Sequence, residues 1–248
     1  MVSERGDKPI QPLLEVYLLG VLDYEDALRL QRRLVYEVSG AGGQLAALIL
    51  CEHPAIISVG RSGSRSHIEC DDEQLAARGL GIRWVSRGGG CMLHVPGQLA
   101  IYPIWPFQPS SARVRDYLSR LERCLLEVLE EFSVRAKPQA DHTGLWTPAG
   151  QIAAVGISLS RWVSYHGVTL NVGGPTDRFR ILHPERNGAL RATTMEAERQ
   201  RPAPMAKVRE CLVRKFIETF ELERSTFYSA HPMLKQRRSL HVYAASSR

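Results

Sequence analysis

The chain has 248 residues, of which 44% are hydrophobic and 23% are charged, values typical of soluble globular proteins. They argue against a disordered tail, a collagen-like repeat or a low-complexity scaffold. The formal net charge of +6 fits a nucleic acid, a membrane surface or an acidic protein as the partner, and does not choose among them.

Two further features suggest a cellular setting. No stretch reaches the roughly 18 apolar residues of a membrane span, and residues 1–11 lack the apolar centre of a secretion signal. The five cysteines are odd in number, widely scattered and without CxxC spacing, which favours reduced thiols and no structural zinc. We therefore expect a cytoplasmic protein that does not bind membranes and has no metal and no cofactor.

Helical and extended patterns alternate along the first half of the chain. After Asp23, a residue type that caps helices, apolar residues recur at helical spacing until Gly40. A second, shorter helix is predicted over 71–78, closed by Gly79. Short apolar runs predict strands at 45–50, 56–59, 82–86 and 99–105.

The clearest helix lies in the second half, where apolar residues of 114–132 share one face. Strands are predicted at 152–159 and 168–172, separated by a turn at Tyr165-His166-Gly167. Residues 173–204 read as a long polar connection, of a length that is often functional. A last amphipathic helix is expected over 205–220, followed by a basic tail to residue 248. Together these elements predict one α/β (α+β) domain over 1–248 with a mixed β-sheet, the final helix region forming a small appendage.

The most informative segment is 87–99, RGGGCMLHVPGQL. Three consecutive glycines let backbone amides approach a ligand closely, although a glycine triplet alone more often marks a turn. Arg87 can offer a fixed fork of donors to a carboxylate, phosphate or carbonyl. The arginine before the glycines and the His and Pro-Gly-Gln after them make a binding loop the better interpretation.

This segment resembles the signature of the lipoyl(octanoyl) transferases, the LipB-type branch of the biotin/lipoate protein ligase superfamily, RGG-x-x-T-x-H-G-PGQL-x-x-YP. Further similarities follow in the family's order over residues 50 to 195. They are EHP at 52–54, GRS at 60–62, GQIAAVG at 150–156 beside the family's GKIAAIG, WVSYHGVTLNV at 162–172 beside WVTYHGxALNV, Phe179, and TTM at 193–195 beside Thr-Ser-Leu.

The resemblance implies a biotin/lipoate protein ligase-like fold and the transfer of an octanoyl group from acyl carrier protein to a lysine of a lipoyl domain. The acceptor would be the lipoyl domain of a 2-oxoacid dehydrogenase or the glycine cleavage protein. Such partners are typically acidic, so the net positive charge would steer them toward the site. Nucleic-acid binding has only the charge in its favour, because aromatic residues are not interleaved with the basic ones.

Two positions depart from the family's catalytic pair. Gln151 stands where the family has the lysine of GKIAAIG, and Glu185 where it has the cysteine of PCG. No cysteine occurs between Cys124 and Cys211, so a shifted alignment does not restore the nucleophile. A glutamine amide does not titrate near neutral pH, and a glutamate is a much weaker nucleophile toward a thioester than a thiolate.

Three interpretations of this altered site remain open. In the first, Glu185 is a general base that activates the incoming lysine, with the glycine-rich amides or Arg87 stabilising the oxyanion, or else Cys91 serves as a relocated thiol. In the second, the chain is a non-catalytic protein that binds acyl groups or lipoyl domains. The third, an ATP-dependent ligase, is the weakest, because such ligases usually rely on a pocket lysine.

We therefore assign Gln151 and Glu185 to the catalytic positions. The resemblance places the following residues at the substrate: Arg87, Gly88, Gly89, Gly90, Cys91, His94, Gly97, Gln98, Ala154, Val155, Gly156, Tyr165, His166 and Gly167.

Overall fold

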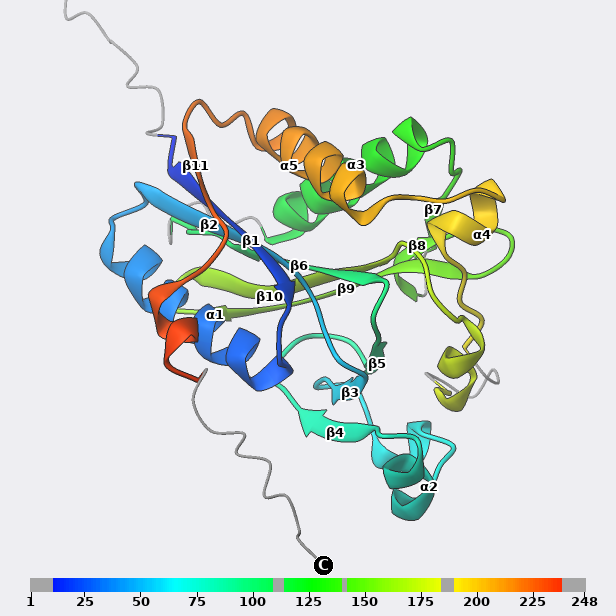
Figure 1. Ribbon diagram of the computed structural model, residues 1–248. Coiled ribbons are helices and arrows are strands. Elements are labelled where there is room, and N and C mark those ends of the chain that lie inside the picture. Colours follow the sequence, from blue (N-terminus) through cyan, green and yellow to red (C-terminus); the bar gives the residue numbers. More distant parts are fainter. Residues whose placement is uncertain (1–10, 109–113, 140–141, 184–189, 238–248) are drawn as a thin grey trace, which may run out of the picture.

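The protein is described here by a computed structural model that covers residues 11–108, 114–139, 142–183 and 190–237. A large mixed sheet forms its centre, with the strand order β11-β1-β2-β6-β10-β9-β8-β7 (Figure 1). Its strands are β1 (Leu13–Val21), β2 (Leu45–Glu52), β6 (Gln98–Ile104), β7 (Lys137–Gln139), β8 (His142–Trp146), β9 (Gln151–Ser160), β10 (Val163–Asn171) and β11 (Ser225–Tyr228).

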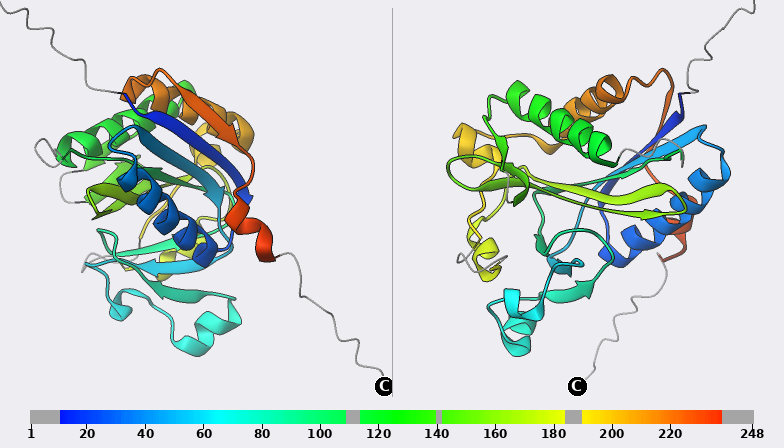
Figure 2. Two further views of the ribbon diagram at one scale, coloured as in Figure 1. Left: turned by 90° about the vertical axis from the view of Figure 1, so that its left-hand side faces the viewer. Right: turned by 180° about the vertical axis from the view of Figure 1, so that it is seen from behind.

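Helices cover both faces of this sheet (Figures 1 and 2). On one face lie α3 (Val114–Glu131) and α5 (Met205–Phe220), whose apolar sides join the largest buried cluster. On the other face lies α1 (Tyr24–Gly40), packed in a second cluster against β1, β2 and β6. The side chain of Asp23 accepts hydrogen bonds from the amides of Glu25 and Asp26, which confirms the predicted start of this helix.

A small second sheet, with the order β4-β3-β5, lies below the face that carries α1 (Figure 1). It consists of β3 (Ile56–Val59), β4 (Gly81–Trp84) and β5 (Cys91–His94), and the short helix α2 (Asp72–Ala77) packs beside it. The glycine-rich loop runs from β4 into β5. The fold therefore places this loop between the small sheet and the face of the large one.

The predicted turn at Tyr165-His166-Gly167 is wrong. Those residues lie inside β10, which pairs continuously with β9 from Val163 to Leu170. The chain reverses instead at Arg161 and Trp162, both with positive φ, as in the two-residue turns that suit a twisted hairpin. His166 also has a positive φ of 58°, so the Tyr-His-Gly pattern marks a local distortion within the strand.

Three further expectations are corrected. The last helix is not an appendage, because Phe216 and Phe220 of α5 are fully buried in the main cluster. The connection 173–204 contains a 3-10 helix, Asp177–Ile181, and α4 (Met195–Arg199) rather than loop alone. The strands β1, β5, β7, β8 and β11 were not predicted. Within the described ranges, no helix is long and apolar enough to cross a membrane.

Candidate functional site

The glycine-rich loop is fixed by a second loop that follows β3. The amides of Gly60, Arg61 and Ser62 donate to the carbonyls of Gly90, Arg87 and Gly89, at 3.0, 3.0 and 3.1 Å. A side chain at position 60 would place its Cβ 2.4 Å from the carbonyl oxygen of Gly89, so the two backbones approach as closely as glycine allows. The segments GRS and RGGG of the sequence therefore form one interlocked unit.

This unit lies directly over β9 of the large sheet. The amide of Gly88 donates to the carbonyl of Ile157 at 2.8 Å. A Cβ on Gly156 would meet the carbonyl oxygen of Gly88 at 2.7 Å, the methyl of Met92 at 3.2 Å and the Cδ of Arg87 at 3.3 Å. Gly156 thus permits the loop to rest on the sheet, which accounts for the glycine at the end of GQIAAVG.

A narrow slot remains between the loop and the sheet, with a cavity volume of about 10 Å³. Ten residues line it: Tyr24, Arg87, Met92, His94, Tyr102, Gly156, His166, Gly167, Val168 and Thr169. Thr169 pairs with Ala154 and His166 with Ile157. The lining residues of β10 thus lie opposite about three residues of β9, a span of roughly 10 Å at 3.3 Å per residue.

The guanidinium of Arg87 forms part of the wall of the slot and bonds to protein atoms there. Its side chain is buried, and its Nη2 donates to the carbonyl and the Oγ of Ser58, both at 2.8 Å, while Nη1 donates to the carbonyl of Gly88. The arginine thus ties the glycine-rich loop to β3. It also leaves a buried cation beside the slot.

Two buried histidines, His94 and His166, line one end of the slot, and a third, His53, lies behind Tyr102. Burial lowers the pKa of each. His53 donates from Nδ1 to the carbonyl of Leu22 at 2.7 Å, and its Nε2 accepts from the hydroxyl of Tyr102 at 2.8 Å. The pKa of His94 falls well below its usual value, because burial and the nearby charges of His53 and Arg87 oppose protonation. Burial, then the charge of Arg87, lowers the pKa of His166 to about 3. At neutral pH these rings are uncharged, so this end of the slot suits an uncharged group.

The position of Gln151 is fixed by the segment that follows residue 190. The backbone amide of Gln151 donates to the backbone carbonyl of Arg191 at 2.8 Å. Its backbone carbonyl accepts from the backbone amide of Thr193 at 3.0 Å and from Nδ2 of Asn171 at 3.3 Å. The same asparagine accepts from Nε2 of Gln98 at 2.9 Å. Gln151 therefore lies at the start of β9, three residues before Ala154, which marks that end of the slot.

The remaining predicted residues lie in different places. Ala154 is half-buried at the slot end of β9, whereas Val155 points into the main cluster. The amide of Gly97 donates to Glu52, whose other oxygen binds Arg209 of α5, so Gly97 and Gln98 support the site from behind. Gly89 and Gly90 are half-buried in the loop. Glu185 lies outside the described residues.

Cys91 does not face the slot, contrary to the expectation from its place in the loop. Side chains alternate along β5, so Met92 and His94 point to the slot and Cys91 points to the opposite side. Its thiol is buried among the apolar residues of the small sheet and donates to the carbonyl of Ser64 at 3.5 Å. Burial raises the pKa of this thiol, which opposes formation of a thiolate.

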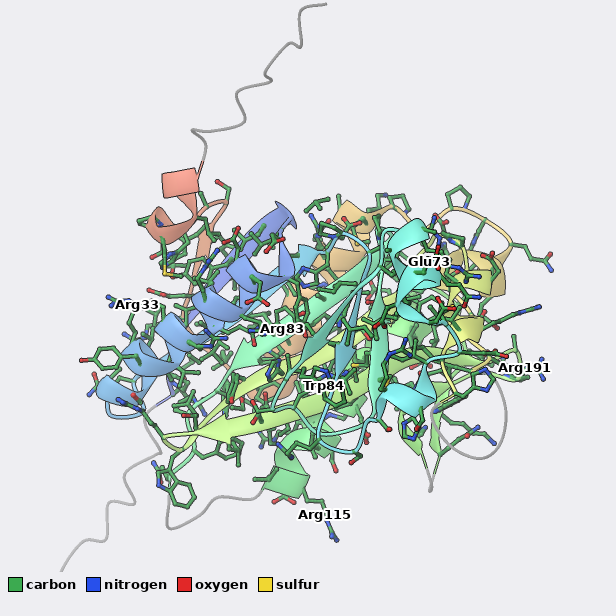
Figure 3. The ribbon with its side chains drawn as sticks, turned by 90° about the horizontal axis from the view of Figure 1, so that it is seen from below. Arg33, Glu73, Arg83, Trp84, Arg115 and Arg191 are labelled. Atoms are coloured by element: carbon green, nitrogen blue, oxygen red, sulfur yellow. The ribbon has the colours of Figure 1, made fainter. Side chains whose placement is uncertain are left out.

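A wider groove of about 480 Å³ lies on the other side of His166. It is bordered by α1, by β4 with Arg83 and exposed Trp84, and by the turn between β9 and β10, and Tyr165 is among its lining residues. Viewed from below, Arg83 and Trp84 lie well away from Arg191, which neighbours Gln151 (Figure 3). The groove and the Gln151 end are thus at opposite ends of β9.

Sequence reasoning found half of the slot. It indicated Arg87, His94, Gly156, His166 and Gly167. It missed five others, namely Tyr24, Met92, Tyr102, Val168 and Thr169. Met92 could have been found because it lies within the segment 87–99, and Tyr102 because it stands at the Tyr-Pro that ends the family's pattern. Tyr24 carries no local signal, since it comes from the start of α1, far away in sequence.

Comparison with known proteins identifies this architecture. The family model described as the lipoyl protein ligase A/B catalytic domain matches residues 23–217. The chain belongs to this family. It is 36% identical over 217 residues to an octanoyltransferase of Myxococcus xanthus, covering 85% of this chain and 60% of that protein. It is 35% identical over 198 residues to an octanoyltransferase of Geobacter metallireducens, covering 80% of this chain and 89% of that protein.

Solved structures agree with the family at the level of the fold. A bipartite lipoate protein ligase of Thermoplasma acidophilum, determined with its E2 lipoyl domain, superposes with a TM-score of 0.63 at 15% identity. The match covers 89% of each chain. The predicted biotin/lipoate ligase-like α/β fold is thereby confirmed, and the slot lies in a member of the lipoyl protein ligase A/B family.

Proposed function

We propose that this chain transfers an octanoyl group from acyl carrier protein to a lysine of a lipoyl domain. The observation that carries the proposal is the narrow slot beside the glycine-rich loop, in a chain whose relatives are named octanoyltransferases. An eight-carbon chain would lie along β9, with its methyl end among the uncharged histidines and its thioester toward Gln151. The carrier protein and the lipoyl domain would approach at that end.

The chemistry would differ from the covalent route of the cysteine-containing relatives. Gln151 cannot take up a proton near neutral pH, and the thiol of Cys91 faces away from the slot. We therefore assign direct attack by the amine nitrogen of the acceptor lysine on the thioester carbonyl carbon. Collapse of the tetrahedral intermediate forms the amide and breaks the carbon–sulfur bond. The proton leaves the amine through Glu185 and passes to the departing thiolate.

The glycine-rich loop lies over Gly156 and Ile157, beside the histidine end of the slot, so it would hold the acyl chain rather than the thioester oxygen. Buried Arg87 contributes a positive potential, although its bonds to Ser58 hold it in the wall.

Transfer is tested with purified protein, octanoyl-acyl carrier protein and an apo lipoyl domain. Mass spectrometry of the domain should show the octanoyl mass gain on its lysine. A cysteine- and lysine-containing relative assayed in parallel provides the positive control. No mass gain under conditions in which that relative is active would overturn the proposed transfer and leave binding without catalysis.

The role of Glu185 is tested by Glu185→Gln, which preserves size and removes the titratable carboxylate. Loss of a general base typically lowers the rate by 10²- to 10⁴-fold. The expected result is therefore a large fall in kcat with little change in octanoyl binding. An unchanged rate would eliminate the general base but not the transfer itself.

A further inference from the structure

The slot is too small in this structure for the chain that it would hold. A cavity of about 10 Å³ has room for about one water molecule, far less than an octanoyl group needs. Some lining residue must therefore move when an acyl chain enters. This reasoning rests on the proposed function, because only an elongated apolar ligand makes the closure significant.

Most of the polar and aromatic lining residues are held by contacts of their own. His94 lies 2.9 Å from the hydroxyl of Ser58, and Tyr102 binds His53. Arg87 donates to the same serine and to its carbonyl. The ring of Tyr24 packs against those of His53 and His94, with centroid distances of 5.1 and 4.9 Å. Moving any of these side chains would break buried hydrogen bonds or ring contacts.

The lining residues of the large sheet offer little movement either. Gly156 and Gly167 contribute backbone that is paired between β9 and β10. Val168 and Thr169 are buried in β10, and their branched Cβ atoms restrict rotation about χ1. These four residues form a fixed floor.

His166 is held as well, because its ring stacks on that of Tyr165 and its backbone amide donates to Gln31. Met92 differs from all nine of these residues. Its unbranched side chain has three rotatable bonds, and the residue is half-buried, so it can turn toward solvent. A Cβ on Gly156 would meet its methyl at 3.2 Å, so the thioether lies across the floor where an acyl chain would pass. The neighbours of Met92 in β5 point into the small sheet and anchor its backbone.

We propose that Met92 is the movable wall of the acyl slot and sets the length of acyl chain that the protein accepts. When Met92 is turned aside, the slot opens along β9. The space that its side chain still occupies limits how far the chain extends. Shortening residue 92 should therefore favour longer acyl groups, because it removes the γ-carbon, the sulfur and the methyl from this space.

The test compares hexanoyl-, octanoyl-, decanoyl- and dodecanoyl-acyl carrier proteins as donors to the apo lipoyl domain. Met92→Ala should raise the ratio of decanoyl to octanoyl kcat/KM by at least about tenfold, the discrimination that one or two methylenes typically provide. Met92→Leu, which retains the bulk, should keep the wild-type preference. Met233→Ala, the same substitution at an exposed methionine, is the matched control and should leave the ratio unchanged.

Each outcome has a distinct meaning. An active Met92→Ala with the wild-type ratio would overturn the role of Met92 and leave octanoyl transfer standing. If the wild type and every variant fail to transfer any acyl group, the proposed function is overturned instead. Calorimetric titration of the wild type and Met92→Ala with free octanoate and decanoate then tests the role of Met92 in binding. Tighter decanoate binding by Met92→Ala supports the movable wall, and equal binding refutes it. Met92→Thr replaces the alanine variant if circular dichroism shows that the latter is unfolded.

Discussion

Replacing His166 by asparagine should remove part of the acid sensitivity of this fold. His166 is buried beside the slot, its amide donates to the side chain of Gln31 at 2.7 Å, and its φ is 58°. Asparagine tolerates this left-handed backbone better than most residues and does not titrate. The substitution therefore removes the titratable ring with little added backbone strain.

The magnitude follows from the difference in pKa between the two states. Burial and nearby arginines lower the pKa of His166 from its ordinary value of 6.5 to about 3 in the folded protein. Between these values the unfolded chain binds a proton that the folded protein does not, so acidification favours unfolding. The stability that neutral His166 contributes is fully present above pH 6.5. This contribution falls as the pH drops below 6.5, and its loss is complete near pH 3. Between pH 6.5 and pH 5 the loss is about 2 kcal/mol, at 1.36 kcal/mol per pH unit.

The assay is urea unfolding, followed by tryptophan fluorescence, at pH 7 and pH 5. The fall in unfolding free energy between these conditions should be about 2 kcal/mol smaller in His166→Asn than in the wild type. His231→Asn is the control, because that ring is only half-buried and lies outside the slot, so its replacement should change the fall in unfolding free energy less. An equal fall in His166→Asn and the wild type would refute the assignment of a neutral, proton-excluding His166.

Three further substitutions test the geometry of the site. Gly156→Ala would place a methyl 2.7 Å from the carbonyl oxygen of Gly88. We expect about 1–3 kcal/mol of destabilisation and loss of octanoate binding. Undiminished octanoate binding would show that the slot lies elsewhere. Tyr102→Phe removes the hydroxyl that donates to buried His53 and should lower the free energy of urea unfolding by about 1–3 kcal/mol, whereas an unchanged midpoint would mean that this hydrogen bond contributes nothing. Cys91→Ala should transfer octanoyl at the wild-type rate, because the thiol faces the small sheet. An octanoyl adduct trapped on Cys91 and found by peptide mass spectrometry would contradict that prediction.

Local patterns in the sequence determined the elements whose signals are complete within a short segment. The capping residue Asp23 and the helical spacing after it predicted α1, and a continuous apolar face predicted α3. The glycine triplet after Arg87 identified the binding loop, because close backbone approach requires glycine wherever it occurs. The same local information placed the turn wrongly at residues 165–167, where glycine serves a distortion inside β10.

Only the tertiary structure decided which side chains share the slot. Tyr24 comes from α1, Met92 from β5 and Tyr102 from β6, and they meet because the small sheet folds back over the large one. The direction of Cys91 was decided in the same way. In a strand, neighbouring side chains point to opposite faces, so the pairing of β5 with β3 turns Met92 toward the slot and the cysteine away from it. That register is set by long-range pairing, which no short segment of sequence contains.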